Sequence, residues 1–277
     1  MGKTLKNYTD YILAKNMQVY NYYHSYFKNL VISRFTWSID ESISRYIETT
    51  LYRNGFLIAC KINGVFLFTK AVALGYNHYG DAISFRTISE LSMFNNINVP
   101  IDDCVVIYNN KIKTPSYLVC SEYAQKIDGI EKLITQNREQ QKIPFFVVAP
   151  EGQKLNMEKI MQKTLNGDIY VLMHEDISAL GCKIDIAETR VKNNLLDYAQ
   201  FKRVIISDFL TEIGINNIGI QKKERLITGE SDENNELILI NRNSFLEPRK
   251  KACIEIKEKF GLDINVEYSI TEKEMII

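Results

Sequence analysis

The segment TRVKNNLLDYAQFKRVIISDFLTEIG, residues 189–214, sets the pattern on which the rest of the chain depends. Its apolar residues recur at intervals of three and four, which is typical of a helix with one buried face. The apolar stripe consists of Tyr198, Ala199, Ile205, Ile206, Phe209, Leu210 and Ile213, and the opposite, polar stripe of Asn193, Asp197, Gln200, Ser207 and Thr211. Gly214 is a natural helix end, because glycine accepts the left-handed conformation found there. We therefore expect a long helix over residues 189–213.

A polar segment follows this helix and opens with QKKER, residues 221–225. The adjacent Lys222 and Lys223 precede an acidic stretch with little apolar content, so we expect a loop here. Its acidic residues are Glu230, Asp232, Glu233 and Glu236. A lysine pair on such a loop suits a surface that touches a polyanion without binding it tightly. The other interpretation is a solvated lysine pair with no ligand.

The bulk composition limits the classes of protein that remain. The chain has 277 residues, enough for one large or two modest domains. Its 34 basic and 34 acidic residues give a formal net charge of zero, so any contact with DNA must come from local placement of lysine and arginine. No apolar run approaches the ~18–20 residues of a membrane span, and we expect neither a span nor a signal peptide. We expect five reduced cysteines in the core and a cytosolic setting, because Cys60, Cys104, Cys120, Cys182 and Cys253 are widely spaced and form no C-x-x-C pair.

The first 113 residues predict a long helix followed by a compact α+β unit. The helix covers Thr9 to Ile32, and a second helix from Ser42 to Arg53 ends at Asn54-Gly55. Asn63-Gly64 between two apolar runs indicates a tight β-hairpin. The expected strands are Phe56–Ile62, Val65–Phe68, Ile83–Ile88 and Cys104–Tyr108.

Another long helix should begin at Thr114-Pro115, with threonine as its cap, and run to Gln141, since Pro144 forbids further continuation. Its apolar seam requires a neighbouring helix. The seam consists of Cys120, Tyr123, Ile127, Ile130 and Ile134. Between the two long helices lies an α/β insertion over residues 143–187. Its expected elements are strands at 144–148, 169–173 and 183–186 and a helix at 157–165.

The C-terminal part predicts a shorter helix and a final strand. An apolar run at Leu237–Ile240 follows the polar loop. Pro248 is expected in the first turn of a helix that runs to Phe260 and ends at Gly261. Residues 264–268 form the last expected strand.

No catalytic motif occurs in the sequence, and we expect neither an enzyme nor a bound cofactor or metal. Gly2-Lys3-Thr4 resembles the end of a phosphate-binding loop but lacks the preceding strand and glycine-rich run. Two acidic groups could hold a metal, His174-Glu175-Asp176 and Asp102-Asp103. The simpler interpretation is a polar loop for the first group and a solvated turn for the second.

Four segments, in the right order, resemble the portal proteins of small short-tailed phages with linear double-stranded DNA, also called head–tail connectors or upper collar proteins. They are residues 105–110, 136–148, 214–225 and 249–262. The resemblance implies an α+β portal fold assembled as a ring, a dodecamer in this family. It further implies an N-terminal arm and helix at 1–38, a wing at 39–113, stem helices at 114–141 and 188–213, a clip at 142–187, a tunnel loop at 214–243 and a C-terminal wing or crown region at 244–277.

The same resemblance implies a function in genome packaging. Double-stranded DNA would enter and leave the capsid through the ring. The implied partners are other copies of the chain, the major capsid protein, a packaging ATPase with or without a packaging RNA, and the lower collar or tail proteins. The protein would belong to the virion and be assembled in the host cytoplasm, without a membrane.

Relatives point lysines into the channel, and Lys222 and Lys223 match that position, with Arg225 beside them. Lys3 and Lys6 are candidate accessory contacts to nucleic acid. Where relatives carry two further channel lysines, this chain has Glu188 and Asp197, which places those additional basic rings in doubt.

Simple geometry agrees with a DNA channel. Helices pack about 8–10 Å apart, so twelve in a ring have their centres on a circle roughly 30–38 Å across. Subtracting ~10 Å of helix thickness leaves a lumen about as wide as a duplex. Two alternatives stay open from the sequence, namely another collar or tail adaptor ring and an unrecognised α+β nuclease.

Overall fold

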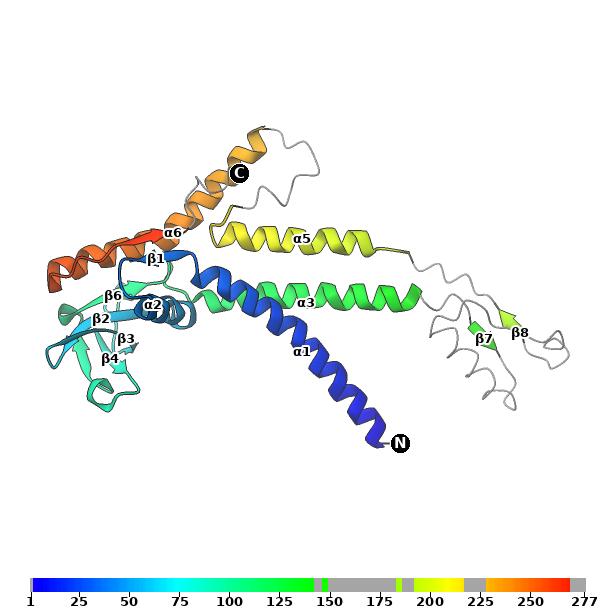
Figure 1. Cartoon of the computed structure of the whole chain (residues 1–277), viewed down its shortest axis with the longest axis horizontal. Coiled ribbons are helices and arrows are strands. Elements are labelled where there is room, and N and C mark those ends of the chain that lie inside the picture. The colour runs from blue at the N-terminus through cyan, green and yellow to red at the C-terminus, as the bar shows by residue number, and fades with distance from the viewer. Residues whose placement is uncertain (1, 142–145, 149–182, 186–191, 217–227, 270–277) are drawn as a thin grey trace. The chain divides into compact units, whose positions relative to one another are not determined.

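The computed structural model describes residues 2–141, 146–148, 183–185, 192–216 and 228–269 (Figure 1). The chain divides into two compact units, residues 1–127 with 204–277 and residues 128–203. The helices are α1 (Gly2–Ile32), α2 (Glu41–Asn54), α3 (Ser116–Gln141), α5 (Leu195–Glu212) and α6 (Thr228–Phe260), with short 3-10 turns η1 (Ser92–Phe94) and η2 (Ile101–Asp103). The strands are β1 (Phe35–Trp37), β2 (Phe56–Ile62), β3 (Val65–Ala73), β4 (Ser84–Ile88), β5 (Asn98–Pro100), β6 (Cys104–Tyr108), β7 (Phe146–Val148), β8 (Lys183–Asp185) and β9 (Val266–Tyr268).

A five-stranded antiparallel sheet in the order β5-β4-β3-β2-β6 forms the centre of the first unit. The predicted hairpin between β2 and β3 is confirmed. Asn63 and Gly64 both have positive φ, 51° and 83°, as the tight primed turn requires. The β3 strand continues to Ala73, beyond the predicted end at Phe68, because it pairs with β4.

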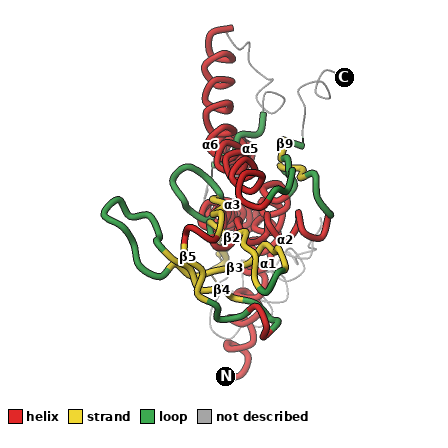
Figure 2. Tube along the Cα trace, turned by 90° about the vertical axis from the view of Figure 1, so that its left-hand side faces the viewer, coloured by secondary structure: helices red, strands yellow, loops and turns green. Residues whose placement is uncertain are grey.

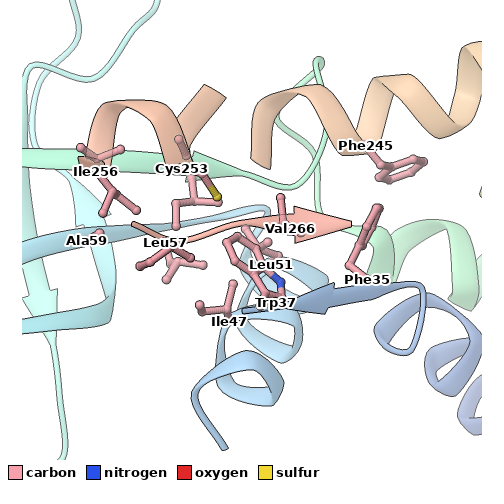
Figure 3. Close-up of a cluster of buried hydrophobic side chains, with 14 residues drawn as sticks. Phe35, Trp37, Ile47, Leu51, Leu57, Ala59, Phe245, Cys253, Ile256 and Val266 are labelled. Carbon is pink, nitrogen blue, oxygen red and sulfur yellow. The ribbon is translucent and has the colours of Figure 1, made fainter. Parts of the chain in front are cut away.

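Each face of this sheet packs against a different core. On one face, Leu57 and Ala59 lie against apolar residues of α2, α6 and β9. Figure 3 shows Cys253 and Ile256 of α6 directed toward these two strand residues. On the other face, side chains from β2 and β6 are enclosed by β4 and β5. The sheet is thus covered on both sides, which explains the near-continuous burial of β2.

Strands from opposite ends of the chain form a second, two-stranded sheet. β1 pairs antiparallel with β9, and Trp37 lies opposite Val266. In Figure 2, β9 lies apart from the grouped strands β2 to β5. The predicted last strand is confirmed, although β1 and β5 were not predicted. Both have three residues, too few for a periodic pattern to appear.

Three long helices share a third core. Cys120 and Ile127 of α3 pack with Phe27 of α1 and Phe209 of α5. The Phe27 and Phe209 ring centroids are 4.0 Å apart. The first part of the apolar seam predicted for α3, Cys120, Tyr123 and Ile127, therefore has its neighbouring helices in this unit.

The predicted boundaries of two helices need correction. α1 begins at Gly2 rather than Thr9. α5 begins at Leu195 rather than Thr189, because Asn193 accepts a hydrogen bond from the Leu195 N–H and so starts the helix. Ser207, predicted on the polar stripe, is buried, since it lies one turn before Leu210 on the same face.

The prediction of a polar loop is wrong for residues 228–236, and so is the prediction that Pro248 lies in the first turn of a helix; residues 221–227 lie outside the described residues. α6 already begins at Thr228 and continues through Pro248. Proline cannot donate to the carbonyl four residues earlier, that of Ser244, but the Lys111 N–H binds this carbonyl at 3.1 Å. The axis of α6 changes direction along its length in Figure 1. The hydrogen bond from Lys111 thus replaces the intrahelical bond that proline cannot make, and the helix continues past Pro248.

The second unit contains the distal half of α3, the start of α5 and a two-stranded sheet. Lys202 of α5 forms an ion pair with Glu131 of α3, and the Asn137 side chain donates to the Lys192 carbonyl at 3.0 Å. β7 pairs antiparallel with β8, which confirms strands at two of the predicted positions. The predicted helix at 157–165 and strand at 169–173 lie outside the described residues.

Candidate functional site: the ends of the α5–α6 segment

The predicted channel residues fall largely outside the part of the chain that the structure describes. Lys222, Lys223 and Arg225 belong to residues 217–227, and Glu188 also lies outside the described ranges. Lys3 and Lys6 lie on α1, where only the backbone is described. Asp197 is exposed on the first turn of α5. What the structure does describe is how the two ends of the lysine-bearing segment are held.

The C-terminal end of α5 is held by side chains from the turn between α1 and β1, from α6 and from β9. Carbonyl groups in the last turn of a helix lack partners within the helix. Here the Arg34 guanidinium donates to the Ile213 carbonyl at 2.5 Å, and the Asn241 amide of α6 donates to the Thr211 carbonyl at 2.9 Å. The Tyr268 hydroxyl of β9 donates to the Gly214 carbonyl, also at 2.9 Å. We call this set of contacts the α5 clamp.

Gly214 brings the end of α5 very close to α6. Its φ is +76°, and a Cβ at this position would lie 2.7 Å from both the nitrogen and the Cα of Arg242. The guanidinium of Arg242 also lies over the Tyr268 ring, 4.4 Å from its centroid. The residues that leave α5 at 214 and return by 242 therefore begin and end at nearly one point.

Arg34, the central donor of the α5 clamp, is 1% exposed. It lies over the Phe245 ring at 4.2 Å. Burial lowers the pKa of its guanidinium to about 10, a shift that nearby Tyr268 partly opposes. The side chain is still charged at neutral pH, so its hydrogen bond to α5 is charge-assisted.

A second buried arginine organises the base of α6. Arg249 is fully buried, and all five of its N–H groups have acceptors. Two bind the Glu48 carboxylate at 2.9 Å each, two reach the carbonyl and side-chain oxygens of Asn109, and one reaches the Phe245 carbonyl at 2.7 Å. Glu48 also accepts from the Trp37 indole at 2.9 Å.

This network reaches the start of α3 as well. The Asn109 amide donates to the Thr114 carbonyl and to the Ser116 hydroxyl, both at 2.8 Å. Arg249 therefore connects α2, α6 and the entry to α3. We did not predict this network from the sequence, although two of the segments that carry the family resemblance, 105–110 and 249–262, contain Asn109 and Arg249. The one local indication of a buried ion pair was Glu48, which follows Ile47 on the apolar face of α2.

The remaining chemical candidates have structural explanations where they are described. Asp102 and Asp103 are exposed in η2. Four cysteines are buried and unpaired, and burial raises the thiol pKa of Cys104 and Cys120 to about 12. Cys182 and the 174–176 group lie outside the described residues. Within the described ranges, neither a cluster of three or more metal-ligating side chains nor a helix able to cross a membrane was found.

Comparisons with known proteins identify the family. The model of the family described as Phage Connector (GP10) matches residues 4–273. Among solved structures, the chain is similar to one in the portal and tail of native bacteriophage P68, with 16% identity, a TM-score of 0.48 and coverage of 97% of this chain and 93% of that one. It is also similar to an HK97 family phage portal protein from Corynebacterium diphtheriae, with 9% identity, a TM-score of 0.43 and coverage of 87% and 90%.

A further similar chain comes from the virion of a native gene transfer agent particle, with 8% identity, a TM-score of 0.45 and coverage of 89% and 79%. All three likenesses are distant, and the family match carries the assignment. Because that match spans nearly the whole chain, the protein belongs to the phage connector family, the portal proteins that are structural components of phage virions.

Proposed function

We propose that this protein forms the portal ring at one vertex of a phage capsid, through which double-stranded DNA is packaged and ejected. The family match over residues 4–273 carries this proposal. In this role the protein is a passive conduit and a docking platform rather than an enzyme. The ring consists of identical copies, and we propose twelve.

In this proposal the chain is partitioned as the resemblance implies. Residues 39–113 form the wing, 114–141 and 188–213 the stem, and 142–187 the clip. Residues 1–38 form the N-terminal arm and helix, and 244–277 a C-terminal wing or crown region. The tunnel segment takes 214–243, and its second half is the first part of α6. Contacts of α3 and α5 within each unit, Tyr123 with Phe209 and Glu131 with Lys202, support the assignment of these helices as a stem pair.

The partners follow from the same role. DNA occupies the channel, the capsid protein surrounds the ring, and a packaging ATPase, with or without a packaging RNA, docks before the lower collar and tail proteins. The protein is a virion component assembled in the host cytoplasm.

Lys222, Lys223 and Arg225 are proposed to border the channel. The α5 clamp supports this, because it holds the two ends of the segment that carries these three residues, near Gly214 and near Asn241. Repeated around a ring, the lysines form a belt that contacts phosphates without reading sequence and weakens as salt rises. With Glu188 and Asp197 in place of additional lysines, attachment elsewhere in the channel is weak, and weak attachment allows DNA to slide.

Alanine substitution of the lysine pair tests the proposal. Heads carrying Lys222→Ala/Lys223→Ala should contain intact rings but retain less packaged DNA than wild-type heads after a salt challenge. The matched control is Lys222→Arg/Lys223→Arg, which keeps the charge and should retain DNA normally. If heads with the alanine variant retain as much DNA as wild-type heads, the lysine belt has no role in DNA retention.

A further inference from the structure

The β6 strand lies at an open edge of the five-stranded sheet. The Asn109 N–H donates to the Gly55 carbonyl at 2.8 Å, which makes these two residues a hydrogen-bonded pair. In an antiparallel ladder such pairs alternate, so Ile107 and Val105 also bond toward β2. The N–H and carbonyl groups of Val106 and Tyr108 must then point away from β2, and they have no partner among the described residues.

A groove of about 830 Å³ runs along this edge. Its floor includes Val106 and Tyr108. One wall is formed by Ala82 and Ile83, just before β4, and the other by Pro248 and Ala252 of α6. The small alanine side chains leave room on both walls. A strand placed beside β6 would direct alternate side chains to these two walls.

The groove is not suited to nucleic acid. Four lysines and four carboxylates line it, so its net charge is zero. Two of the lysines are already paired, Lys113 with Asp81 and Lys111 with Glu247. Lys259 donates to the Cys104 carbonyl at 2.8 Å and so covers only the first residue of the edge. Phosphate recognition needs excess positive charge, whereas an extended peptide needs the free backbone groups that Val106 and Tyr108 offer.

We infer that this groove binds an extended segment of a different protein of the particle, which adds a sixth strand to the sheet at β6. The expected segment is charge-balanced, has apolar side chains facing the walls, and spans about five residues, the length of β6. A second copy of this chain is a poorer occupant. The opposite edge of the sheet, β5, has three residues and ends at Pro100, which has no N–H to donate.

Amide hydrogen exchange at Val106 and Tyr108 tests this inference, which rests on the proposed role in the virion. The two amides should exchange rapidly in the purified connector and at least about 100-fold more slowly in assembled particles, because a paired strand protects the amides it binds. Protection already present in the purified connector would show that copies of this chain cover the edge. Rapid exchange in both samples would show that no strand binds. Either result overturns the inference.

Two substitutions provide an independent test. Val106→Pro removes only the outward N–H and spares the pairing with β2, whereas Val106→Thr keeps that N–H as the matched control. Ala82→Trp fills the groove from its rim and serves if the proline variant does not fold. The proline and tryptophan variants should form normal rings but enter particles at least about tenfold less efficiently, while the threonine variant enters normally. Normal entry of folded Val106→Pro and Ala82→Trp rings would overturn the inference and leave the channel proposal untouched.

Discussion

The buried Arg249 donates to five acceptors at once, so its replacement should lower the stability of the first unit. Arg249→Met leaves the Glu48 carboxylate buried without a counter-charge, which typically costs about 3–5 kcal/mol. Denaturant unfolding of the variant and of Lys250→Met, an exposed neighbour expected to change stability by less than ~0.5 kcal/mol, measures the difference. If both variants unfold alike, the network does not stabilise the fold.

Alanine substitution of two glycines with similar φ distinguishes the cost of backbone strain from the cost of a steric clash. Gly214 and Gly261 have φ of +76° and +71°, but only Gly214 has neighbours where a Cβ would lie. Gly261→Ala should cost about 1–2 kcal/mol, the usual penalty for a left-handed residue with a side chain. Gly214→Ala should cost clearly more, because the backbone of Arg242 would have to move. Denaturant unfolding of both variants, at one protein concentration, measures the two costs. Equal losses of unfolding free energy would contradict a close approach of α5 and α6.

His24 predicts a dependence of stability on pH. Its Nε2 lies 3.0 Å from the Tyr52 hydroxyl, and burial together with the nearby charge of Lys28 lowers the pKa of the ring below 6.5. The unfolded chain therefore takes up this proton more readily, and stability should fall as the pH decreases below about 6.5. Thermal unfolding between pH 7.5 and 5.5 should show a smaller loss for His24→Gln than for wild type. Parallel curves would rule the histidine out as a contributor.

For single residues, burial could be predicted from the sequence more readily than interaction partners. The prediction that the cysteines lie in the core is confirmed for Cys60, Cys104, Cys120 and Cys253. The pairing of Arg249 with Glu48 could not be predicted, since the two residues are separated by 201 positions and no periodicity connects them. The position of Lys222 and Lys223 at a channel is still a prediction.

Among the elements, α6 offers the sharpest test. In an isolated helix, replacing an interior proline by alanine gains about 3 kcal/mol. In this protein the Ser244 carbonyl already binds the Lys111 N–H, so Pro248→Ala would restore a donor whose acceptor is occupied. We expect a net change below about 1 kcal/mol in denaturant unfolding. A gain of 2 kcal/mol or more would show that the contact with Lys111 does not compensate the proline.

Element boundaries show where local signals end. β6 and the ends of α2 and α6 lie where the turn residues and glycines indicated, because those signals act over a few residues. The length of α6 could not be predicted. Its acidic first turns lack an apolar stripe, and Pro248 indicates a helix start unless one knows that Lys111 lies beside it.

For the whole molecule, the sequence predicts an insertion at residues 143–187 between two long helices, and this stays a prediction because most of these residues lie outside the described ranges. The proposed ring predicts the mass of the assembled protein. Native mass spectrometry of DNA-free protein should give one species near twelve times 32.1 kDa, about 385 kDa. A 32 kDa monomer at micromolar concentration would contradict the channel.

The pairing of β1 with β9 has a consequence for how the chain is made. Trp37 meets its strand partner Val266 only after 229 further residues have been synthesised (266 minus 37), which takes about 11 to 46 seconds at ~5–20 residues per second. During that interval the ribosome-bound chain carries a tryptophan that lacks its strand partner and an open edge of β1. The first unit therefore completes its core only after Val266 has been synthesised, and chaperones have access to it until then.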